Sequence, residues 1–213
     1  MKPRPIDLRR LIVLPALCAA LLSGCAAVVV GAAGGAAAIA TDRRMTDVIV
    51  TDERIENSAS SQLAKRFGEG PHFNVTSFNK QVLLTGEVPN EQMKADAEML
   101  VLKIPDVRAV YNELTVGPSS SFANRSNDSY ITSEVKARMT ASGKFNPMQV
   151  KVVTEANTVF LMGLVTRQEA DDAAAAARTA NGVRRVVRIF EYVTLPPPTN
   201  KPAQQQPATS QRP

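Results

Sequence analysis

Gln81-Val82-Leu83-Leu84-Thr85-Gly86-Glu87-Val88 decides the fold, because a second version of it occurs later in the chain. That version is Thr158-Val159-Phe160-Leu161-Met162-Gly163-Leu164-Val165, and the two glycines fix the register. Both stretches are rich in apolar and β-branched residues, a composition that predicts strands. A segment that recurs at a fixed offset indicates two copies of one structural unit.

The repeat extends on both sides of this strand. Pro105–Val110 corresponds to Asn181–Val186 after one deleted residue. Before the strand, Asp52, Ile55, Ala59 and Leu63 correspond to Asp128, Ile131, Val135 and Met139. We therefore expect two domains, at residues 46–117 and 128–194, joined by a linker at 118–127, where the chain reads Gly-Pro-Ser-Ser-Ser over Gly117–Ser121.

Each copy begins with an amphipathic pattern that predicts a helix, followed by two alternating runs that predict a hairpin. The helices are expected at 52–67 and 128–139, with Thr51 and Asp128 as candidate N-caps. The hairpin strands are expected at 73–77 with 81–88, and at 150–154 with 158–165.

A second helix follows, at 90–102 and 167–179, and Thr166 with Glu169 forms a capping box in the second copy. The last strand alternates over 110–116 and 186–192. Because a helix joins the second and third strands, they should pair in parallel through a right-handed crossover. The predicted fold class is α+β, with helix-strand-strand-helix-strand order and both helices on one face of a three-stranded mixed sheet.

Gly86 and Gly163 lie late in the second strand of each copy. A side chain there would obstruct a bend or the approach of a helix. The alternative is that the glycines allow a ligand to approach the backbone.

The chain opens with a positive segment and an apolar core of about 12 residues, which is too short to span a bilayer. The core ends in Leu22-Ser23-Gly24-Cys25. Residues 1–24 are therefore predicted to be a signal peptide. The motif resembles the bacterial lipobox, which implies that Cys25 is lipidated and that Ala26 is compatible with sorting to the outer membrane, facing the periplasm.

Residues 25–45 form the lipidated N-terminus and an Ala/Gly-rich spacer. With three glycines it is a poor and short helix for spanning a membrane, which favours a flexible or bilayer-contacting spacer over a glycine-zipper packing segment. At the other end, residues 195–213 are rich in Pro and Gln and predict a disordered tail.

Catalytic and metal chemistry finds little support in the composition. Cys18 lies in the signal and Cys25 carries the lipid, so no thiol remains. One histidine, His72, cannot assemble the usual zinc ligand sets and is interpreted as a turn residue. The carboxylate pairs Asp171-Asp172 and Glu53 with Glu56 fit solvated helix faces. We expect no enzyme activity, no metal and no cofactor.

Charge separates the two copies. Residues 46–117 hold seven Lys/Arg and eleven Asp/Glu, net −4, whereas residues 122–193 hold ten and seven, net +3. Without residues 1–24 the whole chain carries only +2, from 21 basic and 19 acidic residues, so nucleic acid is not an expected partner.

Val-x-Leu-x-Gly-x-Val at Val82–Val88, its counterpart at 159–165, and Gly-Val-x-x-Val at Gly182–Val186 resemble the BON domain. Two such domains behind a lipobox are similar to the dual-BON outer-membrane lipoproteins. The resemblance implies a non-enzymatic protein that binds anionic phospholipid through its second domain, supports outer-membrane integrity and is enriched at division sites.

The basic second copy suits anionic headgroups such as phosphatidylglycerol or cardiolipin. The candidate phospholipid-binding residues are Tyr130, Lys136, Arg138 and Lys144. Tyr130 and Arg138 are eight residues apart and so share one side of the helix. A solvated charged face is the alternative for these residues.

Arg184, Arg185 and Arg188 are candidate supporting residues, although strand alternation puts Arg185 on the opposite face from the other two. The alternative function is a periplasmic adaptor that binds an envelope protein, such as an assembly machine or a cell-wall hydrolase regulator.

Overall fold

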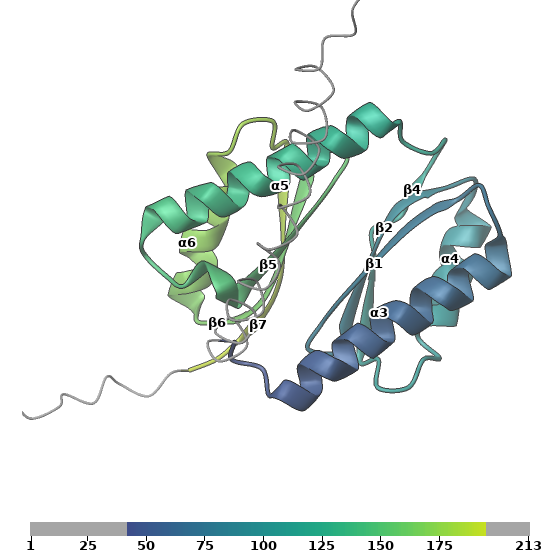
Figure 1. Ribbon diagram of the computed structural model, residues 1–213, viewed down its shortest axis with the longest axis horizontal. Coiled ribbons are helices and arrows are strands. Elements are labelled where there is room, and N and C mark those ends of the chain that lie inside the picture. Colours follow the sequence, from purple (N-terminus) through teal and green to yellow (C-terminus); the bar gives the residue numbers. More distant parts are fainter. Residues whose placement is uncertain (1–41, 195–213) are drawn as a thin grey trace, which may run out of the picture.

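A computed structural model describes residues 42–194, and Cys25, most of the spacer and the C-terminal tail lie outside that range. The chain forms two α+β units in series, each with two helices covering one face of a sheet. The two sheets face each other in the middle of the molecule and the helices lie on the outside, giving four layers (Figure 1).

The first unit contains α3 (Thr46–Phe67), β1 (His72–Phe78), β2 (Gln81–Val88), α4 (Glu91–Val101), β3 (Ala109–Asn112) and β4 (Thr115–Val116). β1 and β2 form an antiparallel hairpin, and β3 pairs with β2 in parallel. The expected last strand is interrupted, because β4 pairs separately with the end of β2.

The second unit contains α5 (Phe122–Ser142), a 3₁₀ turn η2 (Pro147–Gln149), β5 (Val150–Glu155), β6 (Thr158–Val165), α6 (Arg167–Arg178) and β7 (Arg185–Tyr192). Its sheet has the order β5-β6-β7, with β5 antiparallel and β7 parallel to β6. The predicted α+β class, element order and strand directions are confirmed in both units.

Both first helices begin earlier than the sequence indicated. α3 starts at Thr46 rather than Asp52, and α5 starts at Phe122 rather than Asp128. The side chain of Ser121 accepts a hydrogen bond from the Asn124 N–H at 3.2 Å and caps α5. The predicted linker is therefore partly helical, since its last six residues belong to α5.

The predicted N-caps Thr51 and Asp128 are wrong, because both residues lie inside their helices. Asp52 and Asp128 are instead buried residues that anchor the hairpin turns. The Asp52 carboxylate accepts the N–H groups of Asn79 and Lys80, both at 2.7 Å, and Asp128 accepts those of Ala156 and Asn157 at 3.0 and 2.9 Å. These pairs form the two-residue hairpin loops, in which every residue has positive φ. Side chains tolerate that conformation poorly, so the paired carboxylates offset a local cost.

The repeated glycines face backbone rather than a helix. A Cβ on Gly86 would lie 2.0 Å from the His72 carbonyl oxygen, and one on Gly163 would lie 2.6 Å from that of Gln149. Gly86 also has φ +116°, a bend that coincides with the interruption between β3 and β4. The expected bend is present in the first unit. The predicted approach of a packed α-helix is wrong, because backbone of β1 occupies that space beside Gly86 and the last residue of η2 occupies it beside Gly163.

Each unit has its own core between helices and sheet. In the second, Ile131, Val135 and Met139 of α5 pack on β5 and β6 and on an alanine-rich face of α6. A third apolar cluster lies between the sheets and contains Phe78 and Leu83 of the first unit with Phe160, Met162 and Ile189 of the second. The sheet faces that the helices leave uncovered therefore bury one another.

Polar contacts surround this central cluster. Asn79 donates to Glu191 at 2.6 Å and Arg108 pairs with the same carboxylate at 3.0 Å. Lys151 pairs with Glu56 at 2.8 Å, across the same boundary. An apolar centre with a polar rim is the anatomy of a specific protein interface, and it fixes the two units against each other.

Candidate functional site

The candidate site lies on α5, which is the outer helix of the second unit. Its buried side is formed by Asp128, Ile131, Val135 and Met139, and Gly143 ends it in the left-handed conformation at φ +62°. The opposite side faces solvent along the whole helix.

Exposed positions of α5 carry no carboxylate. Arg125, Lys136 and Arg138 are exposed, while the two acidic residues of the helix are buried Asp128 and half-buried Glu134. Two large aromatic side chains project from the same helix, Phe122 at 79% and Tyr130 at 60% exposure. The solvent side of α5 is thus cationic and aromatic.

The four predicted phospholipid-binding residues do not form one continuous row. Tyr130 and Arg138 share a side, with Glu134 between them pairing Arg138 at 2.8 Å. Lys136 lies on the other flank, where it lines a shallow groove with Thr140, Met148 and Val150.

Lys144 follows the helix and contacts Asp172 of α6 at 3.3 Å, with 63% of its side chain exposed. The Gln168 side chain and Lys144 lower the pKa of the Asp172 carboxyl, which therefore stays ionised beside Lys144. The cationic side chains therefore lie on both flanks of α5, with Arg138 on one flank and Lys136 on the other, and Lys144 follows the end of the helix.

The three candidate supporting arginines divide as the strand alternation predicted. Arg188 reaches Asp171 of α6 at 2.7 Å, on the helix side of the sheet. Arg185 reaches Glu113 of the first unit at 3.2 Å, on the side between the sheets. Arg184 is exposed beside the Ala156–Asn157 turn. These arginines do not gather into one basic patch with α5.

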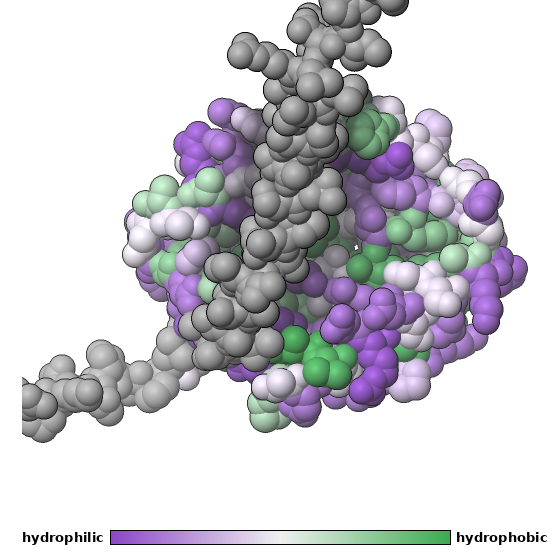
Figure 2. Space-filling view, viewed as in Figure 1, coloured by the Kyte–Doolittle hydropathy of each residue, from purple (hydrophilic) through white to green (hydrophobic). Residues whose placement is uncertain are grey.

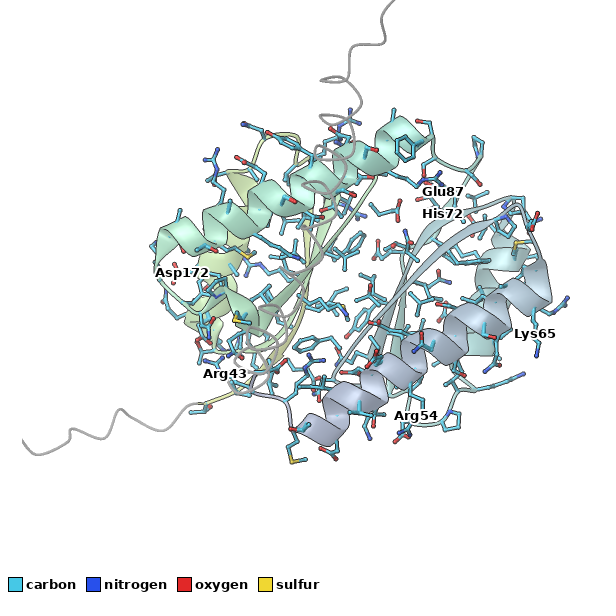
Figure 3. The ribbon with its side chains drawn as sticks, viewed as in Figure 1. Arg43, Arg54, Lys65, His72, Glu87 and Asp172 are labelled. Carbon is cyan, nitrogen blue, oxygen red and sulfur yellow. The ribbon has the colours of Figure 1, made fainter. Side chains whose placement is uncertain are left out.

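Sequence reasoning missed three features near this surface. Phe122 and Arg125 were assigned to the linker. The signal that could have placed them in the helix is Ser121, because serine is a favourable N-cap residue and its hydroxyl accepts the backbone N–H of Asn124. Arg43, in the segment assigned to the spacer, contacts the second unit instead of the first (Figure 3). No local pattern indicates that contact.

Arg43 is held by three groups of the second unit. Its guanidinium pairs with both carboxylate oxygens of Glu169 at 2.6 Å and donates to the Leu164 carbonyl oxygen at 3.0 Å. Its backbone N–H donates to Gln149 at 3.3 Å. The hydrogen bonds from Arg43, helped by those from Thr166, lower the pKa of Glu169 to about 2.

The carboxylate pairs proposed as solvated surface have ordinary structural partners. Asp171 and Asp172 contact Arg188 and Lys144, and Glu56 contacts Lys151 and the Ser77 N–H. His72 was predicted to be a turn residue. That prediction is wrong, because His72 is the first residue of β1.

Two αββαβ units joined sheet to sheet, with a cationic and aromatic outer helix, define a tandem-repeat α+β protein. The chain belongs to the BON domain family, whose model matches residues 51–118 and 127–194.

Similar proteins include the outer membrane lipoprotein DolP of Haemophilus influenzae, 40% identical over 175 residues that cover 81% of this chain and 90% of the relative. A 21 kDa hemolysin of Actinobacillus pleuropneumoniae is 33% identical over 71% of this chain and 79% of its own length. CdsD, a structural protein of the type III secretion system of Chlamydia trachomatis, matches with 15% identity over 68% of this chain and 92% of that one. Its TM-score of 0.27 is too low to bear on fold or function.

Within residues 42–194 no helix is both long enough and apolar enough to cross a membrane.

Proposed function

We propose that this protein is a non-enzymatic outer-membrane lipoprotein, anchored through Cys25 and facing the periplasm, that binds anionic phospholipid through α5 of its second BON domain. Phosphatidylglycerol and cardiolipin are the ligands that this charge pattern suits. In this role the protein supports outer-membrane integrity and is enriched at division sites, which are the roles implied by its resemblance to the dual-BON outer-membrane lipoproteins.

The observation that carries the proposal is the solvent side of α5. It presents three cations and two aromatic side chains with no exposed carboxylate. Basic residues near a negatively charged membrane contribute about 1 kcal/mol each, and aromatic side chains favour the bilayer interface. A surface of this composition is attracted to anionic lipid, and Glu134, the acidic group between Tyr130 and Arg138, is half-buried and paired with Arg138.

The arrangement of the domains supports the same surface. The sheet faces are buried against each other, which leaves the helix layers as the outer surfaces. The solvent side of α3 in the first domain includes exposed Asp47 and Glu53, and that domain carries a net −4. Of the two helix layers, the one containing α5 suits an anionic membrane better.

The contact made by Arg43 also favours the second domain. Arg43, which follows Cys25 in the sequence by 18 residues, contacts Gln149, Leu164 and Glu169 of the second domain. The 18 residues from Cys25 to Arg43 can span at most roughly 60 Å when fully extended. A tethered domain within that range meets the membrane at a high effective concentration, so weak contacts suffice.

Liposome flotation tests the proposal. Unlipidated protein comprising residues 42–213 should float with phosphatidylcholine vesicles that contain phosphatidylglycerol or cardiolipin, and not with phosphatidylcholine alone. Binding should weaken as salt rises, because exposed charges are screened. Equal flotation with neutral vesicles, or none with either, contradicts the proposal.

A protein-binding role for the first domain is the second candidate. Figure 2 shows hydrophobic patches over the beginning of α3, where Met45 and Val50 are 68% and 51% exposed. Exposed apolar groups of this kind suit docking onto an envelope protein. Crosslinking in cells followed by pull-down at high salt discriminates the two roles: a stoichiometric partner that depends on Val50, without vesicle binding, favours the adaptor.

A further inference from the structure

His72, Glu87 and Glu155 converge at one edge of the boundary between the two domains. His72 and Glu87 are direct partners in the β1–β2 ladder, and their side chains meet with Nδ1 3.0 Å from the Glu87 Oε2 (Figure 3). Glu155 approaches from β5 of the second domain. One ligand atom from each of the three residues lies within 4.8 Å of the other two.

Both carboxylates are buried, each in a residue only 7% exposed. Within residues 42–194 neither has a Lys or Arg partner: Glu87 contacts His72, and Glu155 accepts a hydrogen bond from Asn74 at 2.7 Å. Two buried carboxylates beside a single imidazole are electrostatically costly unless a cation joins them. Arg125 lines the same cavity but pairs with neither carboxylate, so an excess of negative charge remains that favours a cationic ligand.

We propose that His72, Glu87 and Glu155 bind one divalent transition-metal ion, such as Zn²⁺, between the two domains. One imidazole nitrogen and two carboxylate oxygens form a ligand set suited to Zn²⁺ with an open position for water. Ligand atoms around tetrahedral Zn²⁺ lie roughly 3.3 Å apart, with bonds of about 2.0–2.2 Å. The His72 and Glu87 ligand atoms are already 3.0 Å apart, and Glu155 needs to approach them by at most about 1.5 Å to reach that geometry.

Asn74 is the positioning residue of this site. Its amide donates to the Glu155 Oε2 and orients the carboxylate toward β1 and β2. A solvent-accessible cavity of about 370 Å³, lined by His72, Asn74 and Glu155 among others, gives an ion a way in. In the metal-free site the His72 Nδ1 lies 3.0 Å from the Glu87 carboxylate, and binding of the ion through Nδ1 requires the neutral tautomer that carries its proton on Nε2.

Sequence reasoning excluded metal because it counted only His and Cys. The ligand set is assembled from β1, β2 and β5, and the third ligand comes from the other domain. An ion held there would tie the second domain to the first, in addition to the apolar cluster around Phe160.

The test uses untagged full-length lipoprotein in detergent micelles, stripped with EDTA and titrated with Zn²⁺ by calorimetry. We expect one Zn²⁺ per chain. His72→Gln and Glu155→Gln should each weaken the Kd at least about tenfold, the lower end of the cost of losing a supporting group. Glu113→Gln is the matched control, because this boundary carboxylate pairs with Arg185 instead, and it should leave the Kd unchanged.

A second measurement does not depend on any variant. His72 is the only histidine of the chain, so its ring signals in NMR are unambiguous and should shift on addition of one equivalent of Zn²⁺ but not of Ca²⁺, which prefers oxygen ligands. Unshifted ring signals, several weak ions per chain, or unchanged binding by His72→Gln would overturn the proposal.

Discussion

Arg43 and Glu169 form a bidentate ion pair, with both N–O distances at 2.6 Å, that joins the residue before the first domain to the first turn of α6 in the second. Glu169 also closes the capping box of that helix by accepting the Thr166 N–H at 2.8 Å. One carboxylate thus caps a helix and holds the segment that precedes the first domain, so Arg43 lies beside the second domain.

Glu169→Gln should release this segment while retaining a polar cap on α6. Trypsin cuts after arginine, and we expect cleavage after Arg43 and Arg44 to become several-fold faster because the pinned backbone can then enter the protease. Asp172→Asn, on the same helix, is the control and should not change the rate. Equal rates in all three proteins would show that the ion pair does not restrain the segment.

Acid should break the same contact only at very low pH. The pKa of Glu169 is lowered to about 2, below its ordinary value of 4.5. The ion pair is therefore fully present above about pH 4.5 and is lost as pH falls through about 2. In an NMR titration the Arg43 guanidinium signals should keep their bound positions at pH 4; release with a midpoint near 4.5 would contradict the assigned pairing.

Asp52→Ala should destabilise the protein more than Asp128→Ala. The Asp52→Ala substitution removes hydrogen bonds from the Ser77 hydroxyl and from two turn N–H groups, and it also removes an ion pair with Arg44. The Asp128→Ala substitution removes only the hydrogen bonds from two turn N–H groups. Hydrogen bonds to buried charged groups are worth about 1.5–3 kcal/mol each, but their losses are not additive. We expect losses of about 3 and about 2 kcal/mol in urea unfolding at pH 7; losses near zero would refute the anchoring role.

Gly86→Ala should be among the most damaging single substitutions in the first domain. The new Cβ would lie 2.0 Å from the His72 carbonyl oxygen at a φ of +116°. A cost above about 3 kcal/mol follows from backbone displacement and strain together. Gly117→Ala is the matched control, with nothing within 4 Å of its Cβ, and should change the melting temperature little. Similar melting temperatures for both variants would be the contrary result.

Most of the fold could be predicted from periodicity and the repeat. Strand alternation is local, so β2 and β6 were placed correctly, and the Thr166–Glu169 capping box is visible in four residues. The errors came from polar residues with two roles. Asp128 is a good N-cap in isolation, but burial against the hairpin turn makes it an anchor, and the polar residues before it continue the helix.

The candidate site was less predictable, because its contacts are long-range. Helical spacing correctly put Tyr130 and Arg138 on one side, but it could not indicate that Lys136 lies across the helix beside Met148. The pairing of Arg185 with Glu113 and of Arg43 with Glu169 depends on how the two domains pack, which no single segment encodes.

Flotation of charge-reversed variants with phosphatidylglycerol vesicles is the most direct test of lipid binding by α5. Lys136→Glu with Arg138→Glu, and separately Tyr130→Glu, should abolish most of the binding, because they place fully exposed carboxylates on a surface whose one nearby carboxylate, Glu134, is half-buried and paired. Lys65→Glu with Arg66→Glu on α3 makes the same change in net charge and should leave binding largely intact. Equal losses in the α5 and α3 double variants, or undiminished flotation of Tyr130→Glu, would contradict the account.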